Sequence, residues 1–192
     1  MSEVPNYIMG ACWLAFIAYW VIASIGIKRD ASRQGSPLVW IGGRLLLVVI
    51  IVLLVRRHYI AVLQTAINGF TLTHPTVQAI GAGLCVAGLA LAIWARATLG
   101  ANWSASPATK ASHELVTSGP YRRVRHPIYT GMLVMMLGTA CIAGIVGVLV
   151  LVAFAVVVAW RIRVEERLMV ELFPGVYEEY RKRTRALVPF IL

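Results

Sequence analysis

Apolar residues fill four long stretches of this chain, and polar residues are confined to the segments between and after them. The stretches cover residues 7–27, 38–55, 77–97 and 128–160. A hydrocarbon core of about 30 Å is crossed by about 20 helical residues, so each of the first three stretches has the length of one membrane span. The pattern predicts membrane helices that are joined by short loops.

The fourth stretch, from Ile128 to Trp160, is too long for a single span. As one helix it would extend about 50 Å, well beyond the hydrocarbon core. Its middle, GTACIAGIVG from Gly138 to Gly147, has the small residues that a tight turn between two helices uses. We therefore expect a hairpin with arms of about sixteen residues each. The predicted fold is an all-α integral membrane protein of about five transmembrane helices, the last two forming this hairpin.

The composition supports a membrane protein over a soluble one. Of the 192 residues, 59% are hydrophobic, and the mean hydropathy is +0.78. This is more apolar material than a soluble core of this size can bury. The first stretch precedes its basic residues Lys28 and Arg29, whereas a cleaved signal peptide carries them in front, so we expect a retained anchor. No polar segment is long enough for a second domain, and residues 1–192 are expected to form one membrane domain.

The cysteines do not have the spacing of a metal or disulfide framework. Cys12, Cys85 and Cys141 each stand alone in an apolar stretch, without a CxxC pair or a histidine at metal-ligand spacing. This pattern predicts small buried side chains and no metal site. No glycine-rich nucleotide-binding motif occurs either, so a soluble nucleotide-binding fold is not indicated.

The formal net charge of +10 could point to a nucleic-acid partner, but its distribution follows membrane topology instead. With the N-terminus outside, fifteen of the eighteen Lys and Arg residues lie in cytoplasmic segments. Because membrane proteins carry such an excess inside, we place the loop 98–127 and the C-terminus in the cytoplasm and expect no nucleic-acid partner. Small residues repeat at Ala79, Gly83 and Ala87, which permits either internal packing or a dimer.

The first polar cluster precedes the hairpin and contains the segment GPYRRVRHPIYTG, Gly119 to Gly131. Pro127 biases the preceding residue toward an extended conformation and is suited to the first turn of a helix. His126 and Arg125 would then lie at a helix N-terminus, where backbone N–H groups favour a bound carboxylate or phosphate. The flanking tyrosines fit either an aromatic belt at the membrane interface or a cover for an adenine ring.

The second polar cluster, WRIRVEERLMVELFPGVYEEY, begins at Trp160. On a helix that continues out of the last span, Arg161 shares a face with Glu165, and Arg163 shares one with Glu166. Such charges at a membrane boundary need partners. A plain ladder of ion pairs and a ligand site both satisfy that need.

Together these segments resemble a known family. The chain has the run GPYRRVRHPIYTG, a Glu-Glu doublet after the final span, the pattern FPGVYEEY and a tail ending in VPFI. This set resembles the isoprenylcysteine carboxyl methyltransferases and the related phospholipid N-methyltransferases. LGANWSA, from Leu99, and the lead-in HELVTSGPY are similar to the isoprenylcysteine branch. The resemblance covers about residues 99–191, and the first half shares only its hydrophobicity and helix count.

The resemblance implies an integral-membrane methyltransferase that uses S-adenosylmethionine and a lipophilic acceptor entering from the bilayer, among membrane lipids. Three N-terminal membrane helices (1–97) would precede a catalytic half (98–192), with a cytosolic cofactor pocket built from the 98–127 loop and the C-terminal helix. The implied catalytic residues are Arg161 and Glu165, with Arg163 as the alternative to Arg161. The cofactor-binding positions would be Leu115, Val116, Gly119, Tyr121, Arg125, His126, Pro127, Tyr129, Glu165 and Glu166.

The acceptor and some alternatives stay open. Carboxyl O-methylation of an isoprenylcysteine-like substrate is favoured, and a carboxylate acceptor needs no general base because it is already ionised near pH 7. A phospholipid or small amine would need a base, for which Glu165 is the candidate. A sterol-type NADPH reductase is disfavoured, because EERLMVELFPGVYEEY lacks that group's Arg-Asp pair and K-Y-G run. A non-catalytic scaffold of the same fold is the remaining alternative.

Overall fold

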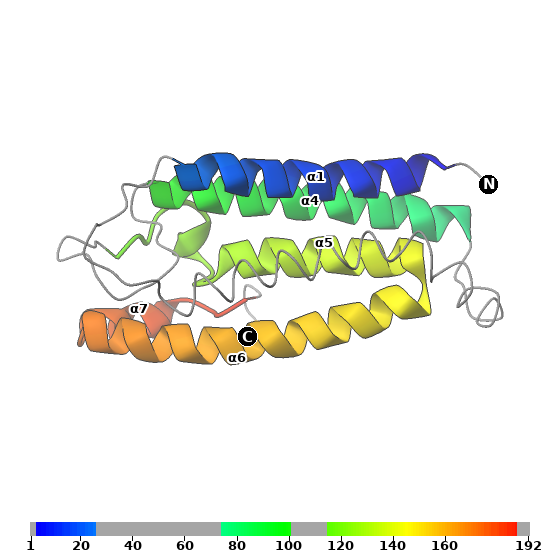
Figure 1. The fold of residues 1–192 in the computed structure, drawn as a ribbon. Helices are drawn as coiled ribbons and strands as arrows, with labels where there is room; N and C mark the ends of the chain where they lie inside the picture. Colours follow the sequence, from blue (N-terminus) through cyan, green and yellow to red (C-terminus); the bar gives the residue numbers. More distant parts are fainter. Residues whose placement is uncertain (1–2, 26–73, 101–114, 188–192) are drawn as a thin grey trace.

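The computed structural model describes residues 3–25, 74–100 and 115–187, and these residues are helical wherever they form regular structure. The predicted span 38–55 and residues 101–114 of the loop 98–127 lie outside them. The helices are α1 (Val4–Ile25), α4 (Pro75–Leu99), the 3₁₀ helix η2 (Gly119–Arg122), α5 (Pro127–Ala143), α6 (Ile145–Leu172) and α7 (Val176–Arg183) (Figure 1). The predicted all-α fold is confirmed for this part of the chain.

Among the described helices, three are long and apolar enough to cross a membrane: Val4–Ala23, Pro75–Leu99 and Ile145–Leu172. The first two coincide with the predicted spans 7–27 and 77–97. Helix α5 is apolar but shorter, at 17 residues. These helices make the protein an integral membrane protein, as predicted.

The predicted hairpin is confirmed, with arms of unequal length. Helix α5 ends at Ala143 and α6 begins at Ile145, separated by Gly144 with φ of 67°. Glycine adopts this left-handed conformation without a Cβ clash, which allows the chain to reverse at once. Helix α6 has 28 residues because it continues past Trp160 to Leu172. The charged residues of that extension are good helix formers, and a helix-breaking residue first appears at Pro174.

Glycines bring α4 and α5 into direct backbone contact. A Cβ added to Gly88 would lie 2.5 Å from the carbonyl oxygen of Gly131, and one added to Gly131 would lie 2.7 Å from that of Gly88. Such close approach is possible only without side chains at both positions. By contrast, Gly83 of the predicted small-residue repeat is exposed, and no atom lies within 4 Å of its added Cβ.

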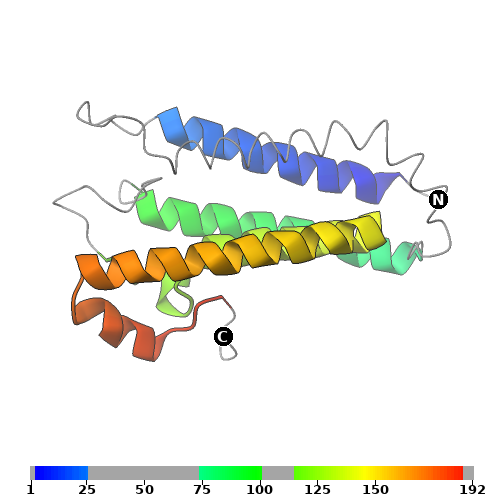
Figure 2. The ribbon, with the colours of Figure 1, turned by 60° about the horizontal axis from the view of Figure 1, so that its bottom comes forward.

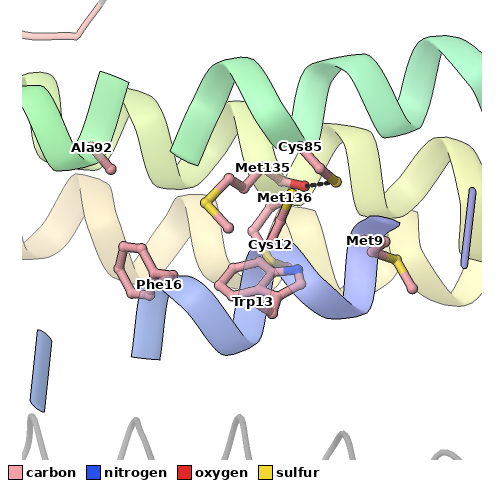
Figure 3. Close-up of a cluster of buried hydrophobic side chains, with 8 residues drawn as sticks. All are labelled: Met9, Cys12, Trp13, Phe16, Cys85, Ala92, Met135 and Met136. Carbon is pink, nitrogen blue, oxygen red and sulfur yellow. Dashed lines mark hydrogen bonds between the residues drawn. The ribbon is translucent and has the colours of Figure 1, made fainter. Parts of the chain in front are cut away.

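The core lies where α1, α4 and α5 meet (Figure 3). Buried members include Trp13 and Cys12 from α1, Cys85 from α4 and Met135 from α5. Trp13 Nε1 donates a hydrogen bond to Thr139 Oγ1 at 3.0 Å, which ties α1 to α5. Cys12 and Cys85 are free and buried, as predicted, whereas Cys141 is free but only half-buried.

Candidate functional site

The site lies at one end of the helices, where the segment before α5 pairs with the segment after α7. Val124 and Arg185 form a parallel bridge. The amide of Arg125 donates to the carbonyl of Arg185 at 2.7 Å, and that of His126 donates to the carbonyl of Ala186 at 3.0 Å. The amide of Arg185 donates back to Arg123 at 3.2 Å. The C-terminal segment therefore fixes the loop that carries the RHP residues.

Pro127 and His126 form the start of α5, as the sequence predicts. Pro127 is fully buried and occupies the first turn of α5. His126 is the N-cap, and its carbonyl accepts a hydrogen bond from the amide of Thr130 at 3.1 Å. Its backbone, with φ of −125° and ψ of 58°, is not helical, but it does not reach the extended conformation that the following proline favours. Its imidazole points away from solvent, with 9% of the side chain exposed. The helix start thus positions the imidazole against α6.

Glu165 belongs to a three-residue hydrogen-bonded cluster between α5 and α6. Arg161 Nε donates to Glu165 Oε1 at 2.9 Å, one helical turn away, and also to the hydroxyl of Tyr129 at 2.5 Å. The Tyr129 hydroxyl in turn donates to Glu165 Oε1 at 2.7 Å. Arg161 Nε, the Tyr129 hydroxyl and Glu165 Oε1 thus satisfy one another, which stabilises these half-buried groups at the membrane boundary.

Glu166, the next residue of the helix, faces a different set of partners. Arg125 Nε donates to Glu166 Oε1 at 2.7 Å, and Arg181 Nε lies 3.6 Å from Glu166 Oε2. Arg125 Nη1 also donates to the carbonyl of Thr184 at 2.6 Å. Arg125 therefore connects the glutamate of α6 to the chain that follows α7.

His126 lies between the two glutamates. Its Nδ1 is 3.7 Å from Glu165 Oε2, and its Nε2 is 3.5 Å from Glu166 Oε1. Both separations exceed a normal hydrogen bond, and among the described residues Nε2 is buried without a hydrogen-bond partner. A buried polar atom of this kind beside two carboxylates marks a place where a ligand with donors and acceptors fits.

The tyrosines of η2 and α7 support the site from the side. Tyr180 donates its hydroxyl to the carbonyl of Tyr121 at 2.6 Å. Burial raises the pKa of Tyr121 and of Tyr177 above the ordinary value, and it raises the pKa of Tyr180 to about 12, so all three phenols are neutral at physiological pH. Their role here is packing and hydrogen bonding.

The predicted site residues fall into two groups. The first group meets in one cluster and comprises Arg125, His126, Tyr129, Arg161, Glu165 and Glu166. The second group lies in the segment that leads to α5: Leu115 and Val116 are half-buried, Gly119 has a φ of 57° and packs against Thr98, Tyr121 is buried in η2, and Pro127 is buried at the start of α5.

The structure distinguishes the two arginines of α6 and corrects one expected pairing. Arg163 was the alternative to Arg161, but it is exposed, whereas Arg161 contacts Tyr129 and Glu165. Arg163 also forms no ion pair with Glu166 in the described part of the chain. Glu166 pairs instead with Arg125 of the segment before α5. Both side chains are largely buried where this segment packs against α6, so each charge needs the other as a partner.

Sequence reasoning missed two contributors to this end of the molecule. Arg181 reaches Glu166 from α7, and no helical spacing connects the two residues. Arg96 is buried and donates to the carbonyls of Gly100 and Ala23 at 3.1 and 3.4 Å, so it joins the ends of α4 and α1. The sequence feature that could have identified the role of Arg96 is its position in the last turn of an apolar helix, where basic side chains bind free backbone carbonyls.

Comparison with known proteins identifies the family. The model of the family described as "Phospholipid methyltransferase" matches residues 76–175, just over half of the chain. The chain belongs to the phospholipid methyltransferase family. The matched region contains α4, the described loop, the hairpin and the glutamate doublet, and it ends within the turn before α7.

Proteins similar to this chain include named isoprenylcysteine enzymes. The chain is 40% identical over 83 residues to protein-S-isoprenylcysteine O-methyltransferase B of Arabidopsis thaliana, which is 41% of each chain. It is 29% identical over 190 residues to protein-S-isoprenylcysteine O-methyltransferase of Schizosaccharomyces pombe, covering 93% of this chain and 72% of that protein. The match thus spans less than half of the Arabidopsis protein and most of the yeast one. The resemblance drawn from the motifs is confirmed.

A solved structure has the same fold. The eukaryotic intramembrane Ras methyltransferase ICMT (isoprenylcysteine carboxyl methyltransferase) superposes with a TM-score of 0.61 at 22% sequence identity. The superposition covers 97% of this chain and 68% of that one. At this identity the likeness concerns the helical membrane fold.

Proposed function

We propose that the protein transfers a methyl group from S-adenosylmethionine to the carboxylate of an isoprenylcysteine-like acceptor. The observation that carries the proposal is the cluster of Arg161, Tyr129 and Glu165 beside His126, directly beyond the apolar part of α6. A water-soluble donor and a lipophilic acceptor can meet at such a boundary. The excess of basic residues in the loop and tail favours the cytoplasmic face.

The chemistry of the side chains fits the methyl donor. When bound, S-adenosylmethionine supplies an activated methyl group on a sulfonium, together with an ammonium, a carboxylate and ribose hydroxyls. Glu165 and Glu166 offer carboxylate oxygens to its cationic and hydroxyl groups, and His126 Nε2 offers a buried nitrogen whose hydrogen bond is unmade among the described residues. Tyr129 and the helix N-terminus at His126 complete the polar wall.

Arg161 is the residue suited to the acceptor carboxylate. Its contacts with Tyr129 and Glu165 both use Nε, and its terminal nitrogens form no bond with the described residues. A guanidinium that is held at Nε presents its other donors in a fixed orientation. Because the acceptor carboxylate is ionised near pH 7, alignment and exclusion of water are the tasks left to the protein.

Arg125 takes a positioning role in this proposal. Its Nε is bonded to Glu166 and its Nη1 to the carbonyls of Thr184 and Arg181, and its side chain is only 10% exposed. The sequence motif suggested that this guanidinium binds the carboxylate of S-adenosylmethionine. In the structure, two of its three nitrogens are already bonded within the protein. Arg125 therefore holds Glu166 in place for the donor.

An amine acceptor is the second candidate, and Glu165 would be its base. Glu165 Oε1 already accepts hydrogen bonds from Arg161 and Tyr129. An oxygen that is engaged in two hydrogen bonds is poorly placed to take a proton from an amine. This geometry favours O-methylation over N-methylation.

The test is a methyl-transfer assay with the purified full-length protein in detergent. Labelled S-adenosylmethionine is offered with N-acetyl-S-farnesylcysteine or with phosphatidylethanolamine, and the product is treated with base. Base-labile label on the farnesylcysteine derivative is the expected result, because carboxyl esters hydrolyse. Base-stable label on the phospholipid would replace the proposal with N-methylation, and absence of donor binding would favour the scaffold.

A further inference from the structure

A basic cleft lies beside the site, between α7 and the segment before α5. Its volume is about 400 Å³, and its lining residues are Arg125, Glu178, Arg181, Lys182, Thr184 and Arg185. Four cationic side chains and one carboxylate give this lining a formal charge of +3. Glu166, which pairs with Arg125 and Arg181, and Glu179, which pairs with Lys182, lower the charge of the surroundings to +1. Like charges brought together in this way repel one another, and a bound anion relieves the repulsion.

The contact between the cleft and α6 indicates how far the cleft lies from the hydrocarbon core of the membrane. Helix α7 lies alongside the end of α6 in both views of the ribbon (Figures 1 and 2). Arg181 Nε is 3.6 Å from Glu166, and Glu166 lies about 9 Å along the helix beyond Trp160, where the apolar stretch ends. The headgroup layer on each side of a bilayer is about 5–8 Å thick. Long Arg and Lys side chains at this depth reach the lipid phosphates.

The chain after α7 keeps the cleft near the membrane. Thr130 Oγ1, in the first turn of α5, donates to the carbonyl of Leu187 at 2.6 Å. Thr184 Oγ1 donates to the carbonyl of Tyr180 at 2.6 Å, which continues α7 into this segment. The two bonds hold the intervening residues, Arg185 among them, against the helix that enters the bilayer.

We propose that this cleft binds the phosphate of an anionic phospholipid headgroup. Arg181, Lys182 and Arg185 are the residues that contact it, since guanidinium groups match phosphate oxygens in a two-pronged geometry. Arg125 is already bonded to Glu166 and Thr184, so it contributes its positive charge from the floor of the cleft.

This lipid site is separate from the proposed methyl-transfer site, because neither Arg161 nor Tyr129 lines it. The two sites are connected through Arg125 and Arg181, which line the cleft and also pair with Glu166. Lipid binding does not require methyl transfer, so the two proposals can fail separately.

The experiment compares lipid retention by native mass spectrometry of the detergent-solubilised protein, titrated with phosphatidylglycerol or phosphatidylcholine. We expect the wild type to retain phosphatidylglycerol preferentially. The double variant Lys182→Gln, Arg185→Gln is expected to weaken that binding about ten-fold or more. The control, Arg163→Gln with Arg167→Gln, removes the same charge from two exposed residues of α6 outside the cleft and should leave retention unchanged.

Three outcomes would overturn the proposal. An equal loss in the α6 control would assign retention to the basic face as a whole. Displacement of phosphatidylglycerol by millimolar inorganic phosphate would identify a soluble phosphate as the ligand. Displacement by S-adenosylhomocysteine would assign the cleft to the methyl-donor site.

Discussion

Replacing Arg161 by lysine keeps the positive charge of the side chain but changes the number and geometry of its nitrogen donors. Arg161 uses a single nitrogen, Nε, for Glu165 at 2.9 Å and for the Tyr129 hydroxyl at 2.5 Å. A lysine ammonium placed at that nitrogen can keep these contacts, but its one remaining N–H cannot form the two-pronged contact with an acceptor carboxylate that a guanidinium offers. If the ammonium reaches the acceptor instead, the contacts with Glu165 and Tyr129 are lost. Either way one charge-assisted interaction is missing.

The size of the effect follows from the burial of this residue. The Arg161 side chain is 22% exposed and that of Glu165 is 23% exposed, so water replaces a lost contact only in part. A hydrogen bond to a charged group contributes about 1.5–3 kcal/mol. We therefore expect kcat/KM for N-acetyl-S-farnesylcysteine to fall by about 10- to 100-fold in Arg161→Lys.

The assay measures methyl transfer at varied acceptor concentration and, separately, the affinity for S-adenosylhomocysteine by calorimetry. Donor affinity should change by less than about three-fold, because Arg161 is assigned to the acceptor. Arg163→Lys is the matched control, since Arg163 lies two residues along the same helix and is exposed. Full activity in Arg161→Lys, or a loss confined to donor affinity, would refute the assignment.

The remaining predictions concern stability. Gly88→Ala should lower stability by about 1–3 kcal/mol, seen as a lower thermal midpoint in detergent, because its Cβ would meet the backbone of Gly131 at 2.5 Å. Gly83→Ala is the control and should have no such effect, since no atom lies within 4 Å. Tyr180→Phe should cost about 1 kcal/mol through the lost bond at 2.6 Å, and an unchanged midpoint would contradict it. The raised pKa of Tyr180, about 12, means that its stabilising contribution is present below the ordinary tyrosine pKa of about 10 and is lost as pH rises toward 12. The fall in thermal midpoint over that pH range should be smaller in Tyr180→Phe.

Local sequence patterns account for most of the helical fold. The apolar stretches predicted α1 and α4, and the excessive length of the fourth stretch required the reversal found at Gly144. The helix start at Pro127 follows from the chemistry of a single residue. The length of α6 was harder to predict from the sequence. A membrane span ends with its apolar residues, whereas a helix continues until its backbone hydrogen bonding is interrupted.

The candidate site was predictable as a set of residues and much less as a set of contacts. Spacing on one helix predicted the pair of Arg161 and Glu165, which the structure confirms. The same reasoning paired Glu166 with Arg163 and missed Arg125, which lies 41 residues away in the chain. Local periodicity has no information on such a contact, because it depends on how the segment before α5 packs against α6.

The two adjacent glutamates explain how one short helical segment serves two structural tasks. Successive residues of a helix point about 100° apart, so Glu165 and Glu166 bind different arginines. Glu165 faces α5 through Tyr129, while Glu166 faces the loop and the C-terminal segment through Arg125. His126 spans the gap between the two carboxylates. A ligand bound at this imidazole would therefore be held jointly by the membrane helices and by the chain outside them, so loss of the C-terminal segment should loosen the site even though the helices remain packed.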